Sequence, residues 1–229
     1  MALTLLRALA LMLAPLLLAT ATSAQSPAGQ CHGFGPDDDP SLGILAVVDS
    51  PDRVRFVANS DEVRGCPSEA PRCARRAFLV PGDQVVMVRR DGDFACVSFV
   101  GGRGARTDGW IPLARLMDAF PEPRWSGTWK RDTTAVITIG SSSGGPLALS
   151  GHATMGPAPN VGGVAARIDG AMRHVAFAIS EARQQIEFDK AGQFDCAVRL
   201  AQLGPYLVVR DNLHCGGLNV TFTGIYVRQ

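Results

Sequence analysis

The hydrophobic positions of this chain fall in short runs separated by turn residues, a pattern typical of β-strands. Two runs near the C-terminal end, Cys196–Leu203 and Tyr206–Asp211, flank the hairpin signal Gly204-Pro205. Gly216-Gly217 breaks the chain before a final run, Asn219–Arg228. We expect these three runs to form a β-meander that closes a small sheet.

The same hairpin predicts a disulfide. Pairing Leu203 with Tyr206 places Cys215 just beyond the position opposite Cys196. A curled chain before Cys215 would bring the two sulfurs within reach, because disulfide-linked Cα atoms lie roughly 5–6 Å apart. We therefore predict that Cys196–Cys215 staples the meander.

The second half of the chain continues the strand pattern back to Trp125. Residues 164–186 also fit a helical period, but Gly162-Gly163 and Gly170 weigh against a long helix, so strands are favoured. With the meander there are about nine runs, enough for an eight-stranded up-and-down β-barrel. The other runs are Trp125–Lys130, Ala135–Ile139, Leu147–Ala153, Val164–Ile168, Val175–Ile179 and Gln185–Phe188.

The first half has the same short runs, so the fold class is all-β. Pro121 and Pro123 indicate a stiff, extended linker over residues 118–124, which separates a domain at 42–117 from one at 125–229. The first-half runs are Ile44–Val48, Val54–Val57, Ala77–Val80, Val85–Val88 and Phe94–Val100, with Trp110-Ile111 ending the sheet pattern and Leu113–Leu116 as a short tail.

The N-terminus resembles a secretory signal over Met1–Ala24. Arg7 supplies the positive charge, Ala8–Ala19 is apolar, and small residues precede a cleavage site before Gln25. The apolar run is shorter than the roughly 20 residues of a membrane span. We expect a periplasmic or secreted product without stable membrane insertion, beginning with a leader over residues 25–41.

Charge and cysteine content narrow the function classes. Without Arg7, 22 − 1 = 21 basic residues balance 21 acidic ones. This balance argues against nucleic acid or an anionic membrane as the main partner, because both require clustered basic charge. Six cysteines in an oxidising compartment favour disulfides, and none of them has CxxC spacing. We expect no metal and no cofactor.

The four N-terminal cysteines leave the pairing open. Cys66 and Cys73 are close in sequence, with prolines that favour a turn between them, so they form the expected pair. Cys31–Cys96 then follows by elimination. The alternative is Cys31–Cys73 with Cys66–Cys96.

Three segments resemble bacterial SH3-like domains: Phe78–Val86, with its Pro-Gly-Asp-x-Val motif, Gly92–Phe99, and Thr107–Ile111, with Gly-Trp-Ile. The resemblance covers Leu42–Met117 and implies a small barrel with an aromatic-lined groove. Phe94 and Trp110 are its ligand-contact candidates, although a place in the barrel core is the favoured interpretation of Trp110. An insertion over Arg64–Arg76 departs from the family pattern.

The opening Trp125-Ser-Gly-Thr-Trp129 and the segment Leu147–Thr154 resemble avidin-like and lipocalin-like barrels. The tail from Gly204 to Tyr226 resembles the ending of uncharacterised exported bacterial proteins, which implies architecture only. Trp125 and Trp129 share one face of an extended strand. They either fill the barrel interior, which is favoured, or stack on a ligand near its mouth.

Candidate catalytic patterns are weak. Gly140–Gly144 matches a serine nucleophile elbow, but strand-like residues rather than a helix follow it, which favours a loop. The scattered histidines at 152, 174 and 214 form no triad, and a disulfide at Cys215 would prevent its use as a nucleophile. Asp37–Asp39 lacks EF-hand spacing and is expected to be a solvated turn.

These observations favour a non-catalytic binding protein whose SH3-like domain contacts cell-wall peptide (peptidoglycan) or a periplasmic protein. The alternative is a secreted or periplasmic inhibitor of a lysozyme-type enzyme, acting through an exposed loop at Gly140–Gly145 or Met155–Gly163. A hydrolase is a remote third hypothesis.

Overall fold

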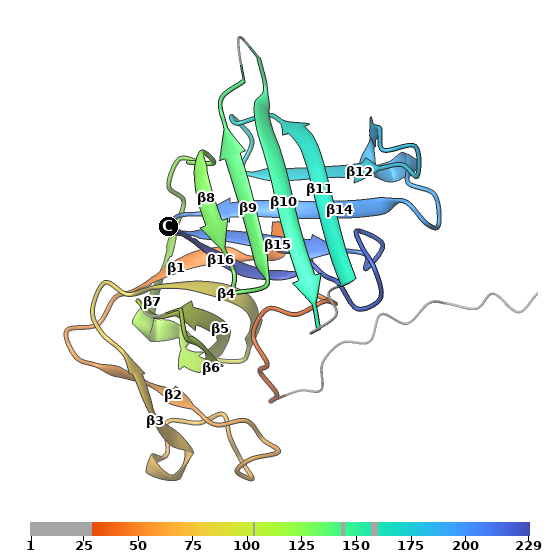
Figure 1. Cartoon of the computed structure of the whole chain (residues 1–229). Helices are drawn as coiled ribbons and strands as arrows, with labels where there is room; N and C mark the ends of the chain where they lie inside the picture. Colours follow the sequence, from red (N-terminus) through yellow and green to blue (C-terminus); the bar gives the residue numbers. More distant parts are fainter. Residues whose placement is uncertain (1–28, 103, 143–144, 157–159) are drawn as a thin grey trace, which may run out of the picture.

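The computed structural model describes residues 29–102, 104–142, 145–156 and 160–229, and it is all-β, as predicted (Figure 1). The predicted signal peptide lies outside the described residues. Only single 3-10 turns interrupt the strands, and none of the helices in the described part is long and apolar enough to cross a membrane. These turns are η1 (Pro40–Leu42), η2 (Pro71–Cys73), η3 (Leu113–Arg115) and η4 (Phe188–Lys190).

The N-terminal sheet has seven strands in the order β3-β2-β6-β5-β4-β1-β7. The sequence pattern was wrong to end this sheet at Ile111, because β7 adds to the free edge of β1, with Met117 opposite Val47. Residues 118 and 119 of the predicted linker therefore belong to a strand. The strands are β1 (Ile44–Val48), β2 (Val54–Val57), β3 (Ala74–Leu79), β4 (Gln84–Asp91), β5 (Phe94–Val100), β6 (Arg106–Pro112) and β7 (Leu116–Ala119).

The C-terminal sheet is a nearly closed barrel of nine strands. Its order, β11-β10-β9-β8-β16-β15-β14-β12-β13, is a meander in which the first strand, β8, pairs with the last, β16. All nine predicted runs form strands, which gives one more strand than the eight expected, and residues 164–186 are strands rather than a helix. The strands are β8 (Gly127–Lys130), β9 (Ala135–Gly140), β10 (Leu147–Met155), β11 (Asn160–Ile168), β12 (His174–Ile179), β13 (Gln185–Ile186), β14 (Cys196–Leu203), β15 (Tyr206–Asp211) and β16 (Gly224–Arg228).

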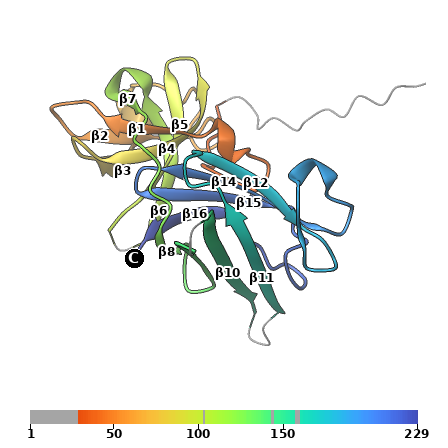
Figure 2. The ribbon, with the colours of Figure 1, turned by 90° about the horizontal axis from the view of Figure 1, so that it is seen from above.

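The barrel stays open between its two edge strands, β11 and the two-residue β13, which pairs with the end of β12. Strands β11 and β12 follow one another in the chain but are not paired. Figures 1 and 2 show the two adjacent strands β10 and β11 diverging from β12 and β14. We call this gap the seam.

The predicted closing meander has the expected register, with Leu203 opposite Tyr206. Cys196 and Cys215 form a disulfide with a Cα–Cα distance of 4.5 Å, and the positive φ of Leu213, 66°, supplies the curl that brings Cys215 back. The last run was predicted to start at Asn219, but its strand begins only at Gly224. The intervening residues instead use their side chains to bind Asp211, as described below.

Side chains fill the barrel interior. Alternate residues of β9, such as Ile137 and Ile139, point inward. The loop before β16 adds Val220 and Phe222. Phe177 and Tyr226 complete the aromatic part of this core. The interior is therefore packed rather than hollow, unlike a barrel that holds its ligand inside.

A second hydrophobic cluster joins the two sheets. Leu45 and Val86 of the N-terminal sheet pack against Leu203 and Tyr206 at the turn between β14 and β15, and Phe34 of the predicted leader lies in the same cluster. The Tyr206 hydroxyl donates to the Gln84 carbonyl oxygen at 2.6 Å. Strands β14 and β15 are thus buried on both faces, which explains why their sequences are nearly continuous apolar runs rather than alternating ones.

The remaining cysteines pair as expected, and the leader is bound to the fold. Cys31–Cys96 ties the leader to β5, and Cys66–Cys73 closes the insertion. The backbone at Cys31 also exchanges two hydrogen bonds with the buried side chain of Asn59. The leader therefore contributes to the core instead of trailing in solvent.

Candidate functional site

The aromatic candidates of the N-terminal domain lie in its core. Trp110 is fully buried, its indole N–H donates to the Gly29 carbonyl oxygen at 3.2 Å, and the Arg89 guanidinium lies 5.3 Å from its ring centre. Phe94 is partly buried against the same cluster, which includes the Cys31–Cys96 disulfide. The leader and this disulfide occupy the place where an open aromatic groove was expected.

The two tryptophans that begin the barrel also belong to its core, in agreement with the favoured interpretation. Trp129 is fully buried and its indole N–H donates to the Trp125 carbonyl oxygen at 2.7 Å. Trp125 is 2% exposed and donates to the Met172 carbonyl oxygen at 2.8 Å. Trp125 also borders a hollow at the barrel end near Pro146 and Asp169.

The serine-rich loop joins strand β9 to strand β10, as the loop interpretation expects. Within its described part, the Ser142 hydroxyl donates to the Pro146 carbonyl oxygen at 2.6 Å and accepts from Arg167 at 2.8 Å. Ser143, Gly144 and residues 157–159 lie outside the described residues, so both loops of the inhibitor hypothesis are described only in part.

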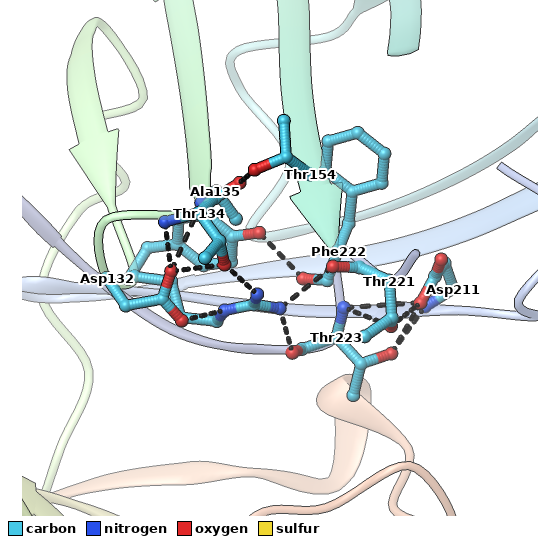
Figure 3. Close-up of polar contacts among 10 residues, drawn as sticks. Asp132, Thr134, Ala135, Thr154, Asp211, Thr221, Phe222 and Thr223 are labelled. Carbon is cyan, nitrogen blue, oxygen red and sulfur yellow. Dashed lines mark hydrogen bonds and ion pairs between the residues drawn. The ribbon is translucent and has the colours of Figure 1, made fainter. Parts of the chain in front are cut away.

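A polar network secures the end of the barrel where β8 meets β16 (Figure 3). The Arg131 guanidinium donates to the carbonyl oxygens of Thr221 and Thr223, both at 2.9 Å. One carboxylate oxygen of the buried Asp211 accepts from the hydroxyls of Thr221 and Thr223, at 2.5 and 2.6 Å. These side-chain bonds compete with a strand ladder, and they hold Val220 and Phe222 inside the barrel.

The three consecutive aspartates face the barrel rather than solvent alone. Asp39 forms an ion pair with Arg199 at 2.6 Å, and Arg210 donates to the carbonyl oxygens of Asp37 and Asp38. Burial by itself raises the pKa of Asp39, but hydrogen bonds from Ser41 and the charges of Arg199 and Arg210 outweigh it and lower the pKa below its usual value. The segment is a turn with Asp37 exposed, as expected, but it also forms a contact between the leader and the barrel.

A groove with a volume of about 700 Å³ lies along the seam. We call it the seam groove. One wall is the outer edge of β11, and the other runs from Ile179 through the β12–β13 turn. The floor carries the Cys196–Cys215 disulfide, and Phe194, which is 61% exposed, meets His214 edge-on at its rim. Its volume falls in the range of ligand pockets, about 300–1,000 Å³.

The edge of β11 in this groove is only partly paired. At one end Gly163 donates to the Cys215 carbonyl oxygen at 3.2 Å, and Gly217 donates to the Val161 carbonyl oxygen at 3.1 Å. At the other end the Gln185 side-chain amide accepts a hydrogen bond from the N–H of Arg167 at 2.7 Å and donates one to its C=O at 3.0 Å.

Ala165 lies between these two ends. Because the backbone groups of successive strand residues point to opposite sides, its N–H and C=O face the seam together with those of Gly163 and Arg167. No hydrogen bond from another residue of the described part reaches the N–H or the C=O of Ala165.

The side chains and backbone groups that line the groove define what it can contact. His152 and His214 both line it, but no cluster of three or more His, Cys, Asp or Glu side chains suited to a metal ion occurs among the described residues. Its sulfurs are joined in the disulfide. The groove offers an apolar rim, backbone donors and acceptors, and space beside the small exposed residues Gly163 and Ala165.

Sequence reasoning missed the seam groove. The only local signals were the Gly162-Gly163 pair, which was used as evidence against a helix, and an exposed Phe194 beside Cys196. Neither signal says that β11 and β12 diverge.

Comparison with protein-family models, with curated proteins and with solved structures finds no match to this chain. The function is therefore argued from the site alone.

Proposed function

We propose that this chain is an exported, non-catalytic binding protein that receives part of a cell-wall peptide or of a periplasmic protein in the seam groove. The observation that carries the proposal is the incompletely paired edge of β11 inside a groove with an apolar rim. Three disulfides fit an oxidising compartment.

The finer fold assignment belongs to the same proposal. Residues 42–117 form an SH3-like small barrel, and residues 125–229 form an up-and-down barrel of eight main strands with β13 as an appendage, as in the exported bacterial proteins that the tail resembles. The sequence placed the ligand contact in the SH3-like domain, at Phe94 and Trp110. The burial of Trp110 supports the barrel as the ligand-binding unit and the SH3-like domain as its support.

A sedimentation assay with insoluble peptidoglycan tests this function. The variant Ala165→Trp fills the groove from an exposed position, and Ala148→Trp places the same bulk on an exposed position of β10 outside it. We expect the wild-type protein and Ala148→Trp to sediment with peptidoglycan and Ala165→Trp to stay in solution. Sedimentation of all three proteins would contradict the proposed site.

Lysozyme activity measured in the same samples separates the alternative. If the wild-type protein and Ala165→Trp inhibit lysozyme equally well, the result would favour an inhibitor that acts through its loops. Absence of both peptidoglycan binding and inhibition would remove the cell-wall proposal.

A further inference from the structure

The seam groove presents backbone hydrogen-bonding groups, and this limits what can occupy it. The N–H and C=O of Ala165 are a donor and an acceptor at the spacing of a strand edge, and the Gly163 C=O beside them also faces the seam. An extended peptide backbone supplies the complementary acceptor and donor at the same spacing.

The fold already uses such pairing at both ends of this edge. Gly216 forms an isolated antiparallel bridge with Gly162, so a non-strand segment acts there as a short neighbouring strand. At Arg167 the Gln185 amide accepts from the N–H and donates to the C=O, as a backbone peptide group would. The edge is therefore covered by a backbone bridge at one end and by a side-chain substitute at the other.

We infer that the seam groove binds a short extended peptide segment, which adds as a strand to the β11 edge at Ala165 and displaces the Gln185 side chain from Arg167. This inference rests on the proposed binding function and names its ligand class and its mode of contact. The peptide exchanges two hydrogen bonds with Ala165 and gains two more at Arg167 when Gln185 leaves.

The groove also selects the side chain that the peptide carries. Phe194 is 61% exposed, Val161 is 56% exposed, and both line the groove together with the partly buried Ile179. Side chains of an added strand alternate between the two faces of the sheet. We therefore expect an apolar residue at the position whose side chain points onto Phe194.

The test begins with a displayed library of random heptapeptides selected on the mature wild-type protein, residues 25–229. The best selected peptide is then titrated by fluorescence polarisation against four variants. Ala165→Trp blocks the groove as a whole, whereas Ala165→Pro removes one backbone donor and adds little bulk. Gln185→Ala removes the internal competitor, and Gln184→Ala, at an exposed neighbouring position, is its matched control.

Strand addition predicts that Ala165→Pro and Gln185→Ala change the affinity for the peptide in opposite directions. Ala165→Pro weakens peptide binding about tenfold or more, because the edge loses a donor. Gln185→Ala strengthens binding several-fold, and Gln184→Ala leaves it unchanged. Ala165→Pro should fold, because its N–H lies outside the β10 ladder and proline is tolerated on such an edge.

Amide hydrogen exchange at Ala165 of the wild-type protein gives a second readout that does not depend on any variant. We expect slow exchange with saturating peptide and fast exchange without it. Equal rates in both states, or full affinity in Ala165→Pro, would refute strand addition.

The outcomes also separate this inference from the proposed function. Binding that Ala165→Trp abolishes but Ala165→Pro and Gln185→Ala leave unchanged would keep the groove as the site and reject the strand mode. A library that yields no peptide, or a peptide that still binds Ala165→Trp, would reject the peptide ligand.

Discussion

Replacement of Leu203 by alanine tests whether the two sheets unfold together. Leu203 is 2% exposed and lies in the cluster that joins the sheets, with Leu45 and Val86 on the opposite side. The adjacent turn allows little collapse, because a Cβ added at Gly204 would lie 2.7 Å from a methyl carbon of Leu45. A cavity left by the truncation would therefore persist.

The expected loss can be estimated from comparable substitutions. A buried Leu→Ala change costs about 2–5 kcal/mol, and incomplete collapse of the site increases the loss. With a dependence on urea of about 2–3 kcal/mol per molar, a loss of about 3 kcal/mol lowers the unfolding midpoint by about 1 M. This is a large fraction of the roughly 5–15 kcal/mol that stabilises a typical domain.

The indole N–H signals of the three tryptophans report on both sheets in one NMR titration with urea. Trp110 lies in the N-terminal core, whereas Trp125 and Trp129 lie in the barrel. We expect Leu203→Ala to lower the midpoint of all three signals together. The control Leu218→Ala, at a residue that is 77% exposed, should leave them unchanged.

A different outcome would refute the coupling. If the signals of Trp125 and Trp129 shift while Trp110 keeps its midpoint, the domains are separable, as the proline linker by itself predicts. Preferential proteolysis at residues 118–124 of the folded wild-type protein would point the same way.

Four further predictions concern other parts of the chain. The double change Cys196→Ser/Cys215→Ser should cost about 3 kcal/mol of unfolding free energy in urea, because it opens a loop of sequence separation 19; an unchanged midpoint would contradict the staple. Because the pKa of Asp39 is lowered from its ordinary value of 3.8 in the folded state, its contribution is present above that value and is lost as the pH falls through the lower folded-state pKa. The stability difference between wild type and Asp39→Asn should therefore shrink between pH 6 and pH 3, and a constant difference would argue against the ion pair. A fluorophosphonate probe should label none of Ser141–Ser143, whereas labelling would revive the hydrolase hypothesis. Mass spectrometry of exported protein should find Gln25 at the N-terminus, and an intact signal segment would contradict cleavage.

Much of the local structure could be predicted from short-range patterns. Runs such as Phe94–Val100 and Cys196–Leu203 have the same bounds in the structure. The Cys196–Cys215 pair also followed from sequence, because Gly204-Pro205 sets the hairpin register that brings Cys215 to Cys196. Turn type and strand register depend on neighbouring residues, which a single sequence displays.

Predictions failed where side chains replace backbone pairing or where distant segments meet. The strand expected from Asn219 begins at Gly224, because the hydroxyls of Thr221 and Thr223 bind the Asp211 carboxylate. Strand β7 was missed because its pattern is short, and its partner β1 lies about 70 residues earlier in the chain. Neither effect leaves a periodic signal.

The sequence by itself determined the fold class, nearly all of the strands and the Cys196–Cys215 pair, since these depend on alternation, turn chemistry and spacing. Two pairings of the four N-terminal cysteines stayed open, and the structure joins Cys31 to Cys96 and Cys66 to Cys73. Only the tertiary structure decided what covers each face and each edge. The apolar runs of β14 and β15 required burial on both sides, but the sequence did not say that Phe34, Leu45 and Val86 would supply the second cover. Likewise, Ala165 lies in an ordinary strand pattern, and its unpaired edge exists because β11 and β12 diverge. The hydrophobic pattern indicates which strand faces must be buried. Which distant segment packs against each face depends on long-range packing.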